Sequence, residues 1–147
     1  MVAITTPLQA VQAPQIEEQM EIVYVPNFTS KEGVEAYIRY KFGASGDIAV
    51  KVMRAESSAS TTVVNWKDVH KQAGCIGSSG LFQIGCGNAP IEEMKNPKKN
   101  IDMAWRLYNE KGRNGKQRGW LPWGVCTSNK VSCFSTPSEK PLATLSY

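Results

Sequence analysis

The segment that ends at Glu56 constrains the fold most, because it places one carboxyl at the end of an apolar helical stripe. Four side chains recur at i, i+4, i+7 and i+8, the spacing of one helix face, namely Ile48, Val52, Ala55 and Glu56. Desolvation in such a stripe disfavours the ionised carboxylate and raises its pKa. We therefore expect a helix that begins at Ser45 or Asp47 and ends with a Glu56 that keeps its proton to higher pH than an ordinary glutamate.

Three further segments have a local signature. Thr29 and Glu32 match a capping box, which predicts a helix that ends near Gly43. Residues 57–79 are rich in Ser and Thr and predict a loop or a short hairpin, followed by the glycine-rich turn Gly77-Ser78-Ser79-Gly80-Leu81-Phe82-Gln83-Ile84. A later helix is expected from Asn96-Pro97 or Asn100, because apolar side chains repeat there at helical spacing: Ile101, Ala104, Trp105 and Tyr108.

In this order, the segments resemble the lysozyme-like superfamily, most closely its soluble lytic transglycosylase and goose-type lysozyme branch. In that branch a helix ends in Glu-Ser, a serine-glycine turn leads into Gly-Leu-(Met or Phe)-Gln-(Ile or Val), and a later helix opens near Asn-Ile. This chain has Glu56-Ser57, Ser78 to Ile84 and Asn100-Ile101, so the resemblance covers residues 31–126. Where the family often carries Tyr-Asn-Ala-Gly, this chain instead has Trp120-Leu121-Pro122-Trp123.

The resemblance implies a mainly α, lysozyme-like α+β fold, with a helical bundle around a sugar-binding cleft and a small loop or hairpin region. At 147 residues the chain fits one such domain. We expect residues 1–28 to form an N-terminal arm or linker, residues 29–133 the catalytic domain, and residues 134–147 a loose tail.

The resemblance also implies a peptidoglycan-cleaving enzyme that acts on the β-1,4 bond between N-acetylmuramic acid and N-acetylglucosamine. Glu56 would be the general acid and then the base. The other positions that match the motifs, or offer aromatic faces beside them, would contact the sugar: Ser57, Ser78, Ser79, Phe82, Gln83, Asn100, Trp120 and Trp123.

Three functions stay open. A lytic transglycosylase is favoured, because no other carboxylate has a motif context and the substrate's own acetamido oxygen can attack the anomeric carbon, which leads to a 1,6-anhydro product. A hydrolytic lysozyme would need a second acid, for which Asp68 is the first candidate, ahead of Glu92 and Asp102. The third is a non-catalytic wall-binding or virion-structural module.

The four cysteines lack the C-x-x-C spacing of a zinc site, and the single His70 does not complete one, so we expect no metal and no cofactor. In a protein that resembles wall hydrolases, an even count indicates disulfides rather than four reduced thiols, with three connectivities possible. We favour Cys86 with Cys126, a bridge that would join the turn after Gln83 to the tryptophan-rich segment.

The net charge of +4 suits glycan strands that carry anionic groups, although solubility alone explains such a value. The tryptophans cluster with the cleft motif rather than with a basic stripe, so we expect no nucleic-acid partner. The chain has no apolar run long enough to cross a membrane, so we expect no membrane insertion. We also expect a monomer. The first 30 residues hold no Lys or Arg and no recognisable signal peptide. The resemblance nevertheless implies an extracellular, wall-associated or virion-associated protein.

Overall fold

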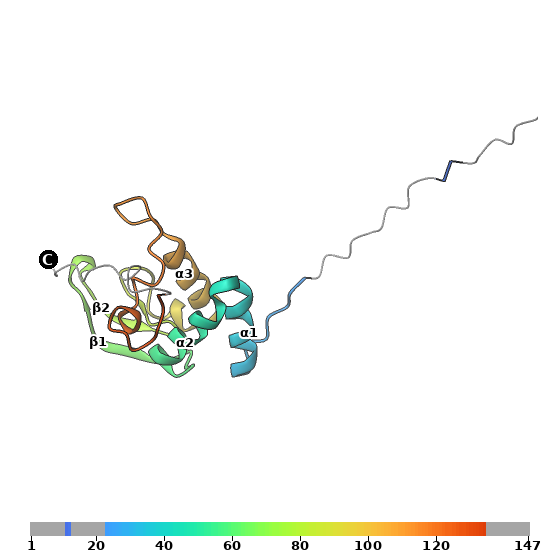
Figure 1. The fold of residues 1–147 in the computed structure, drawn as a ribbon. Helices are drawn as coiled ribbons and strands as arrows, with labels where there is room; N and C mark the ends of the chain where they lie inside the picture. The colour runs from blue at the N-terminus through green and yellow to red at the C-terminus, as the bar shows by residue number, and fades with distance from the viewer. Residues whose placement is uncertain (1–10, 13–22, 135–147) are drawn as a thin grey trace, which may run out of the picture.

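The computed structural model describes residues 11–12 and 23–134, in which helices α1, α2 and α3 lie beside a small antiparallel sheet (Figure 1). In chain order the elements are α1 (Lys31–Phe42), α2 (Gly46–Ser57), β1 (Val64–His70), β2 (Cys75–Ser79), β3 (Ile84–Gly85), α3 (Pro97–Asn109) and α4 (Gly124–Thr127). This is a mixed α+β arrangement, which confirms the predicted fold class at that level.

Helix α1 begins one residue later than its capping box predicts. Ser30 is the N-cap, and its hydroxyl accepts a hydrogen bond from the Gly33 N–H at 3.1 Å. Thr29 does not cap because its own N–H and hydroxyl both donate to the side chain of Asn27. The helix ends where Gly43 adopts a φ of 55°.

The core lies between the three helices and the turn that follows β2. Its innermost side chains come from every one of these elements, and each is shielded from solvent: Ile38, Val52, Met53, Leu81, Phe82 and Ile101. Burial of an aliphatic or aromatic side chain of this size contributes about 2 kcal/mol. Of the stripe predicted on α2 only Val52 is buried, whereas Ile48, Ala55 and Glu56 are half-buried. The face that anchors α2 in the core instead contains Ala49, Val50, Val52 and Met53.

Strands β1 and β2 form the hairpin that residues 57–79 predict, and β3 adds two residues to the same sheet. Val64 pairs with Ser79 and His70 with Cys75, but the register shifts between Asn65 and Val69. Such irregularities bend a strand and re-aim its side chains. Asn65 pairs with Ser78 and Val69 with Ile76, so Asp68 lies within the irregular part of β1.

The predicted bridge between Cys86 and Cys126 is wrong. The disulfides are Cys75–Cys86 and Cys126–Cys133, and each joins cysteines close in sequence, 11 and 7 positions apart. Cys75 begins β2 and Cys86 follows β3, so the sheet brings these two sulfurs together. Cys133 lies after the turn that follows α4, and the chain folds back there onto Cys126.

The packed domain extends past the predicted end of the arm at residue 28. The Tyr24 ring stacks on Tyr40, with centroids 4.5 Å apart, and Phe28 packs edge-on against Tyr37. Residues 1–10 and 13–22 of the arm, and residues 135–147 of the tail, lie outside the described residues. Among the described residues, no helix combines the length and apolar character that crossing a bilayer requires.

We expect reduction of the disulfides to lower the melting temperature. In the chain-entropy model, loops of 11 and 7 residues stabilise the fold by about 3 and about 2 kcal/mol. Thermal unfolding followed by circular dichroism, with and without reductant, measures the effect. Peptide mapping of the unreduced protein is the control on connectivity, and a linked Cys86–Cys126 peptide would contradict the structure.

Candidate active site

Glu56 lies in the last turn of α2, half-buried. The helix ends directly after it because Ser58 takes up a left-handed conformation, with a φ of 53°, and donates its N–H to the carbonyl of Arg54 at 2.9 Å. Ser57 is buried, and its hydroxyl donates to the Met53 carbonyl. Ser57 therefore fastens the helix end, and the sugar contact predicted for it is not supported by this placement.

Burial raises the pKa of Glu56 above its ordinary value of 4.5, because desolvation penalises the ionised carboxylate. The positive charge of Lys130 opposes this shift, and the negative charge of Asp68 adds to it. The direction agrees with the one that the apolar stripe predicts. Glu56 is thus within electrostatic reach of a carboxylate on β1 and an ammonium group after α4.

A cavity of about 230 Å³ opens between the sheet and the segment that follows α3. Asp68 relates this cavity to Glu56, because its carboxylate lines the cavity and its charge also raises the pKa of Glu56. The lining residues are Asp68, His70, Ser78, Gln83, Ile84, Gly85, Asn88, Leu107, Arg118, Pro122 and Trp123.

Four of the predicted site residues reach this cavity, namely Asp68, Ser78, Gln83 and Trp123. The Gln83 amide donates to the carbonyls of Gly80 and Val63, which leaves its oxygen available as an acceptor. The Trp123 indole N–H donates to the Phe82 carbonyl at 3.1 Å, and this bond fixes the ring in the cavity wall. The free amide oxygen of Gln83 can accept a hydrogen bond from a ligand, whereas Trp123 is 4% exposed and forms part of the wall.

Four other predicted contacts are corrected, because Ser79, Phe82, Asn100 and Trp120 are buried and do not line the cavity. Ser79 donates its hydroxyl to the Ile91 carbonyl, and Trp120 stacks on Phe42. The Asn100 amide accepts from the Phe82 N–H and donates to the carbonyls of Ser79 and Met94. These four residues lie in the core behind the cavity and hold its wall in place.

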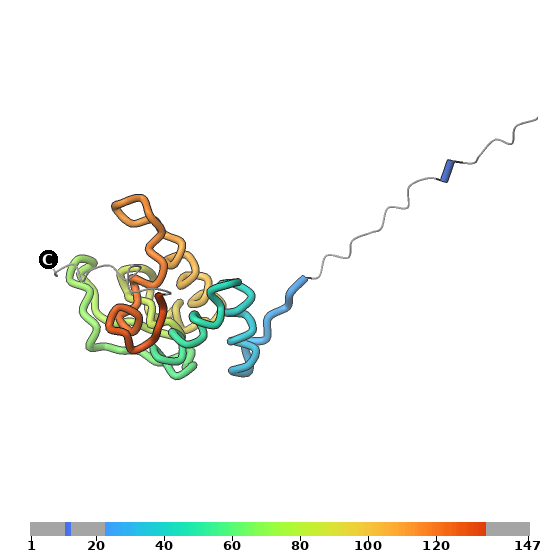
Figure 2. The backbone as a smooth tube through the Cα atoms, in the orientation of Figure 1, coloured from blue at the N-terminus to red at the C-terminus, as the bar shows by residue number. Residues whose placement is uncertain are grey.

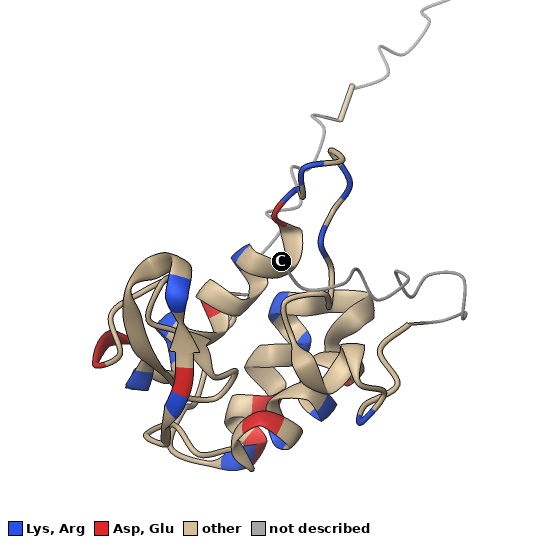
Figure 3. Ribbon diagram, turned by 90° about the vertical axis from the view of Figure 1, so that its left-hand side faces the viewer, with Lys and Arg blue, Asp and Glu red and all other residues tan. Residues whose placement is uncertain are grey.

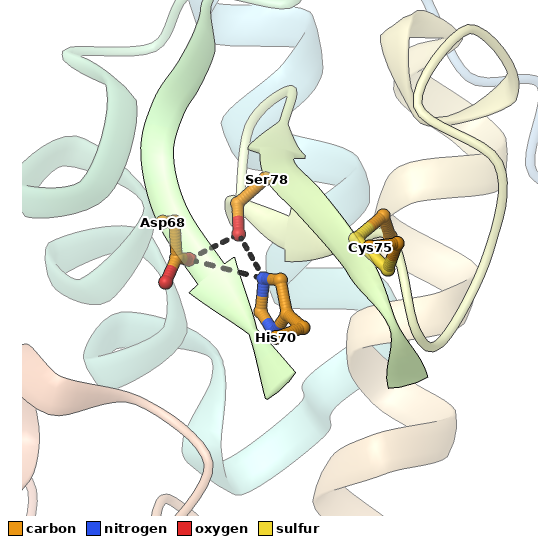
Figure 4. Close-up of a disulfide and its surroundings, with 5 residues drawn as sticks. Asp68, His70, Cys75 and Ser78 are labelled. Carbon is orange, nitrogen blue, oxygen red and sulfur yellow. Dashed lines mark hydrogen bonds and ion pairs between the residues drawn. A yellow bond between two sulfur atoms is a disulfide. The ribbon is translucent and has the colours of Figure 1, made fainter. Parts of the chain in front are cut away.

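His70 lines the cavity, although the sequence assigned it no role beyond an incomplete metal site. Asn88 and Arg118 are further polar lining residues that were not predicted. Its Nε2 lies 3.1 Å from the Ser78 hydroxyl and 3.3 Å from Asp68 Oδ2, and Ser78 itself donates to Asp68 (Figure 4). Asp68 and His70 are two positions apart on β1, so they share a face of the strand. Two polar residues at this spacing in a predicted hairpin strand are the sequence pattern from which their proximity could have been predicted.

A loop with several basic residues leads into the cavity wall. The loop between α3 and Trp120 projects from the body (Figure 2) and carries exposed cations at Lys111, Arg113 and Lys116 (Figure 3). At the foot of the loop, Arg118 binds Glu110 at 2.8 Å and lines the cavity. This side of the site therefore favours anionic ligands.

A second depression, of about 410 Å³, lies between the start of α1 and the end of α2. Its wall contains Glu35 and Arg54, whose side chains are 2.6 Å apart. Glu56 lines neither hollow, but the smaller cavity contains Asp68, whose charge acts on the pKa of Glu56. We therefore place the candidate site at the smaller cavity.

Comparison of the chain with protein-family models, with curated proteins and with solved structures finds no match. In the part of the chain that the structure describes, no three His, Cys, Asp or Glu side chains are grouped as metal ligands. The geometry of the site and the sequence resemblance are therefore the features that point to a function.

Asn100→Ala should destabilise the fold by about 3 kcal/mol or more, because it leaves one buried N–H and two buried carbonyls without their partner. Urea unfolding measures the change. Asn109→Ala is the matched control, because the amide of Asn109 is exposed, donates to the carbonyl of Trp105 and accepts from the exposed side chain of Gln117. A loss no larger than that of the control would contradict the supporting role.

Glu56→Gln should stabilise the protein at neutral pH. Because the pKa of Glu56 is higher in the folded protein than in the unfolded chain, its ionisation lowers the free energy of unfolding. The substitution removes this loss. The gain in free energy of unfolding is full above the folded-state pKa and disappears below pH 4.5, where Glu56 is protonated in both the folded and the unfolded chain. Chemical unfolding across this pH range measures the difference. Glu32→Gln should have the opposite sign, because Glu32 is exposed in the first turn of α1, where negative charge stabilises the helix.

Proposed function

We propose that this chain is a lysozyme-like glycosidase that cleaves the β-1,4 bond between N-acetylmuramic acid and N-acetylglucosamine in peptidoglycan. One observation carries the proposal. The desolvated carboxyl of Glu56 lies within electrostatic reach of Asp68, and Asp68 lines a cavity that also holds Gln83 and Trp123. A protonated acid and a second carboxylate are the groups that glycoside cleavage uses. The Gln83 amide adds a group that can bind an acetamido substituent.

Glu56 is the general acid in this proposal. Its raised pKa keeps the proton on the carboxyl at pH values where an ordinary glutamate has lost it. The proton passes to the leaving glycosidic oxygen as the bond to the anomeric carbon breaks. The ionised Glu56 and the nearby carboxylate of Asp68 then stabilise the positive charge that develops on the sugar.

Two products are open to such a site. In a lytic transglycosylase, the substrate's acetamido oxygen attacks the anomeric carbon, and Glu56 accepts a proton from the 6-hydroxyl as the 1,6-anhydro ring closes. In a hydrolytic lysozyme, water attacks and a second carboxylate accepts its proton. The place of Asp68 in the cavity wall favours the hydrolytic lysozyme. The transglycosylase is the alternative that product analysis tests.

The surroundings of the site support peptidoglycan as the partner. Peptide stems of the wall bear carboxylates, which the cations of the projecting loop attract. Two disulfides suit an oxidising compartment, in keeping with an extracellular, wall-associated or virion-associated protein. A non-catalytic wall-binding or virion-structural module is the candidate from another class, and a desolvated acid with a raised pKa has no use in it.

Glu56→Gln should abolish cleavage of purified peptidoglycan, because the amide keeps the shape of the side chain but has no proton to give. Release of soluble muropeptides, with a zymogram as a second assay, measures the loss. Glu32→Gln removes the same charge from an exposed position and should cleave like the wild type. Turnover by folded Glu56→Gln within a few-fold of wild type would refute the assignment.

A further inference from the structure

Asp68, His70 and Ser78 are one hydrogen-bonded group in the cavity wall (Figure 4). Ser78 has one hydroxyl proton and gives it to Asp68 Oδ2. The remaining contact of Ser78, with His70 Nε2 at 3.1 Å, is then a bond that the imidazole donates. The protons therefore run in one order, from His70 through Ser78 to Asp68.

This group is not a nucleophilic triad. In a Ser-His-Asp triad the serine and the carboxylate bind opposite nitrogens of the imidazole. Here both approach the same nitrogen, Nε2, and the serine proton is directed to the carboxylate. Ser78 is 1% exposed and lies within strand β2, where it has little room to attack a substrate. The group instead immobilises the carboxylate.

The imidazole is itself held in place by packing. Its ring lies directly over Gly85 of β3, where an added Cβ would come within 2.3 Å of Cε1 and 2.7 Å of Nε2. Cys75 pairs with His70 across the hairpin, and its disulfide to Cys86 ties β2 to the residue that follows Gly85. The disulfide thus links the start of β2 to the end of β3, the two segments next to the His70 ring, and this limits the movement of the ring.

Asp68 keeps one oxygen free of this group. Its Oδ2 receives both contacts, whereas Oδ1 has no hydrogen-bond partner among residues 23–134. The side chain is 44% exposed, lines the cavity and acts electrostatically on Glu56. An oriented carboxylate with one open oxygen beside a general acid is suited to hold a water molecule.

We propose that His70 and Ser78 are positioning residues, which hold Asp68 Oδ2 so that Oδ1 orients the water that attacks the anomeric carbon. This inference rests on the proposed function and specifies that the reaction is hydrolysis with a reducing-end product. Glu56 protonates the leaving oxygen, which keeps the electron pair of the broken bond. The water oxygen bonds to the anomeric carbon, and its proton goes to Asp68. Exchange with solvent then returns each carboxyl to its starting state.

Product analysis of four variants tests this role. Muropeptides are separated by mass, since an anhydro end is lighter by one water than a reducing end. Asp68→Asn, Ser78→Ala and His70→Leu should each lower the rate of reducing-end formation at least about tenfold, because a small displacement of a reacting group is costly. The KM and the rate of anhydro-end formation should not change. His70→Gln keeps an N–H donor near Nε2 and should recover most of the rate.

The matched control is Val69→Ala, which lies between Asp68 and His70 but on the other face of β1, 55% exposed. It should match wild type in both rates. Equal loss of both products in the variants, a raised KM, or mainly anhydro ends from the wild type would overturn the positioning role and leave Glu56 as the acid. Failure of the folded wild type to cleave at all would overturn the proposed function and this inference together.

A second measurement does not depend on catalysis. His70 is the chain's one histidine, so its imidazole N–H signal in a nitrogen-15 spectrum is free of overlap. The proton order derived above predicts a slowly exchanging proton on Nε2 that disappears in Ser78→Ala. A neutral ring with its proton on Nδ1 would overturn the inference even if every variant had lost activity.

Discussion

The side-chain amide of Asn100 is the contact on which the cavity wall depends. Because it is fully buried, all of its hydrogen bonds must be made within the protein. From the first turns of α3 it binds the end of β2, the turn after β2 and the segment before α3. Gly80 completes this contact, since a Cβ there would lie 2.1 Å from the Met94 carbonyl oxygen. The turn therefore has a single arrangement, and both sides of the cavity are built on it.

From that turn the structure extends in two directions. On one side Ser78 and Ser79 continue into the hairpin that carries Asp68 and His70. On the other, the Phe82 carbonyl receives the Trp123 indole, which ties the tryptophan-rich segment to the same backbone. Glu56 comes from a separate element, α2, whose position is set by the core. The site forms where these independently anchored parts meet.

The electrostatic environment of Glu56 opposes the stability of the fold at neutral pH. Glu56 is desolvated on a helix end, and the carboxylate of Asp68 makes its ionisation harder still. Lys130 offsets part of this cost. The two carboxyls also differ in their surroundings, since Asp68 is bound by Ser78 and His70 whereas Glu56 has no such partner among the described residues. Different environments for two nearby acids are what allow one to hold a proton while the other accepts one.

Local patterns in the sequence were sufficient for α1, α2 and α3, for the hairpin and for the place of Glu56 at a helix end, because helical period, capping and glycine turns act over a few residues. Contacts between distant segments were not readable in the same way. Asn100 shows the difference: its motif predicted a sugar contact, whereas the turn needed its amide inside. Trp105, predicted on the apolar face of α3, is 40% exposed, with the Lys41 ammonium 4.9 Å from its ring centroid. The cysteine pairs, the burial of Trp120 and the joining of His70, Asp68 and Ser78 were decided only by the tertiary structure, since strand register and the meeting of remote elements depend on the packing of the whole domain.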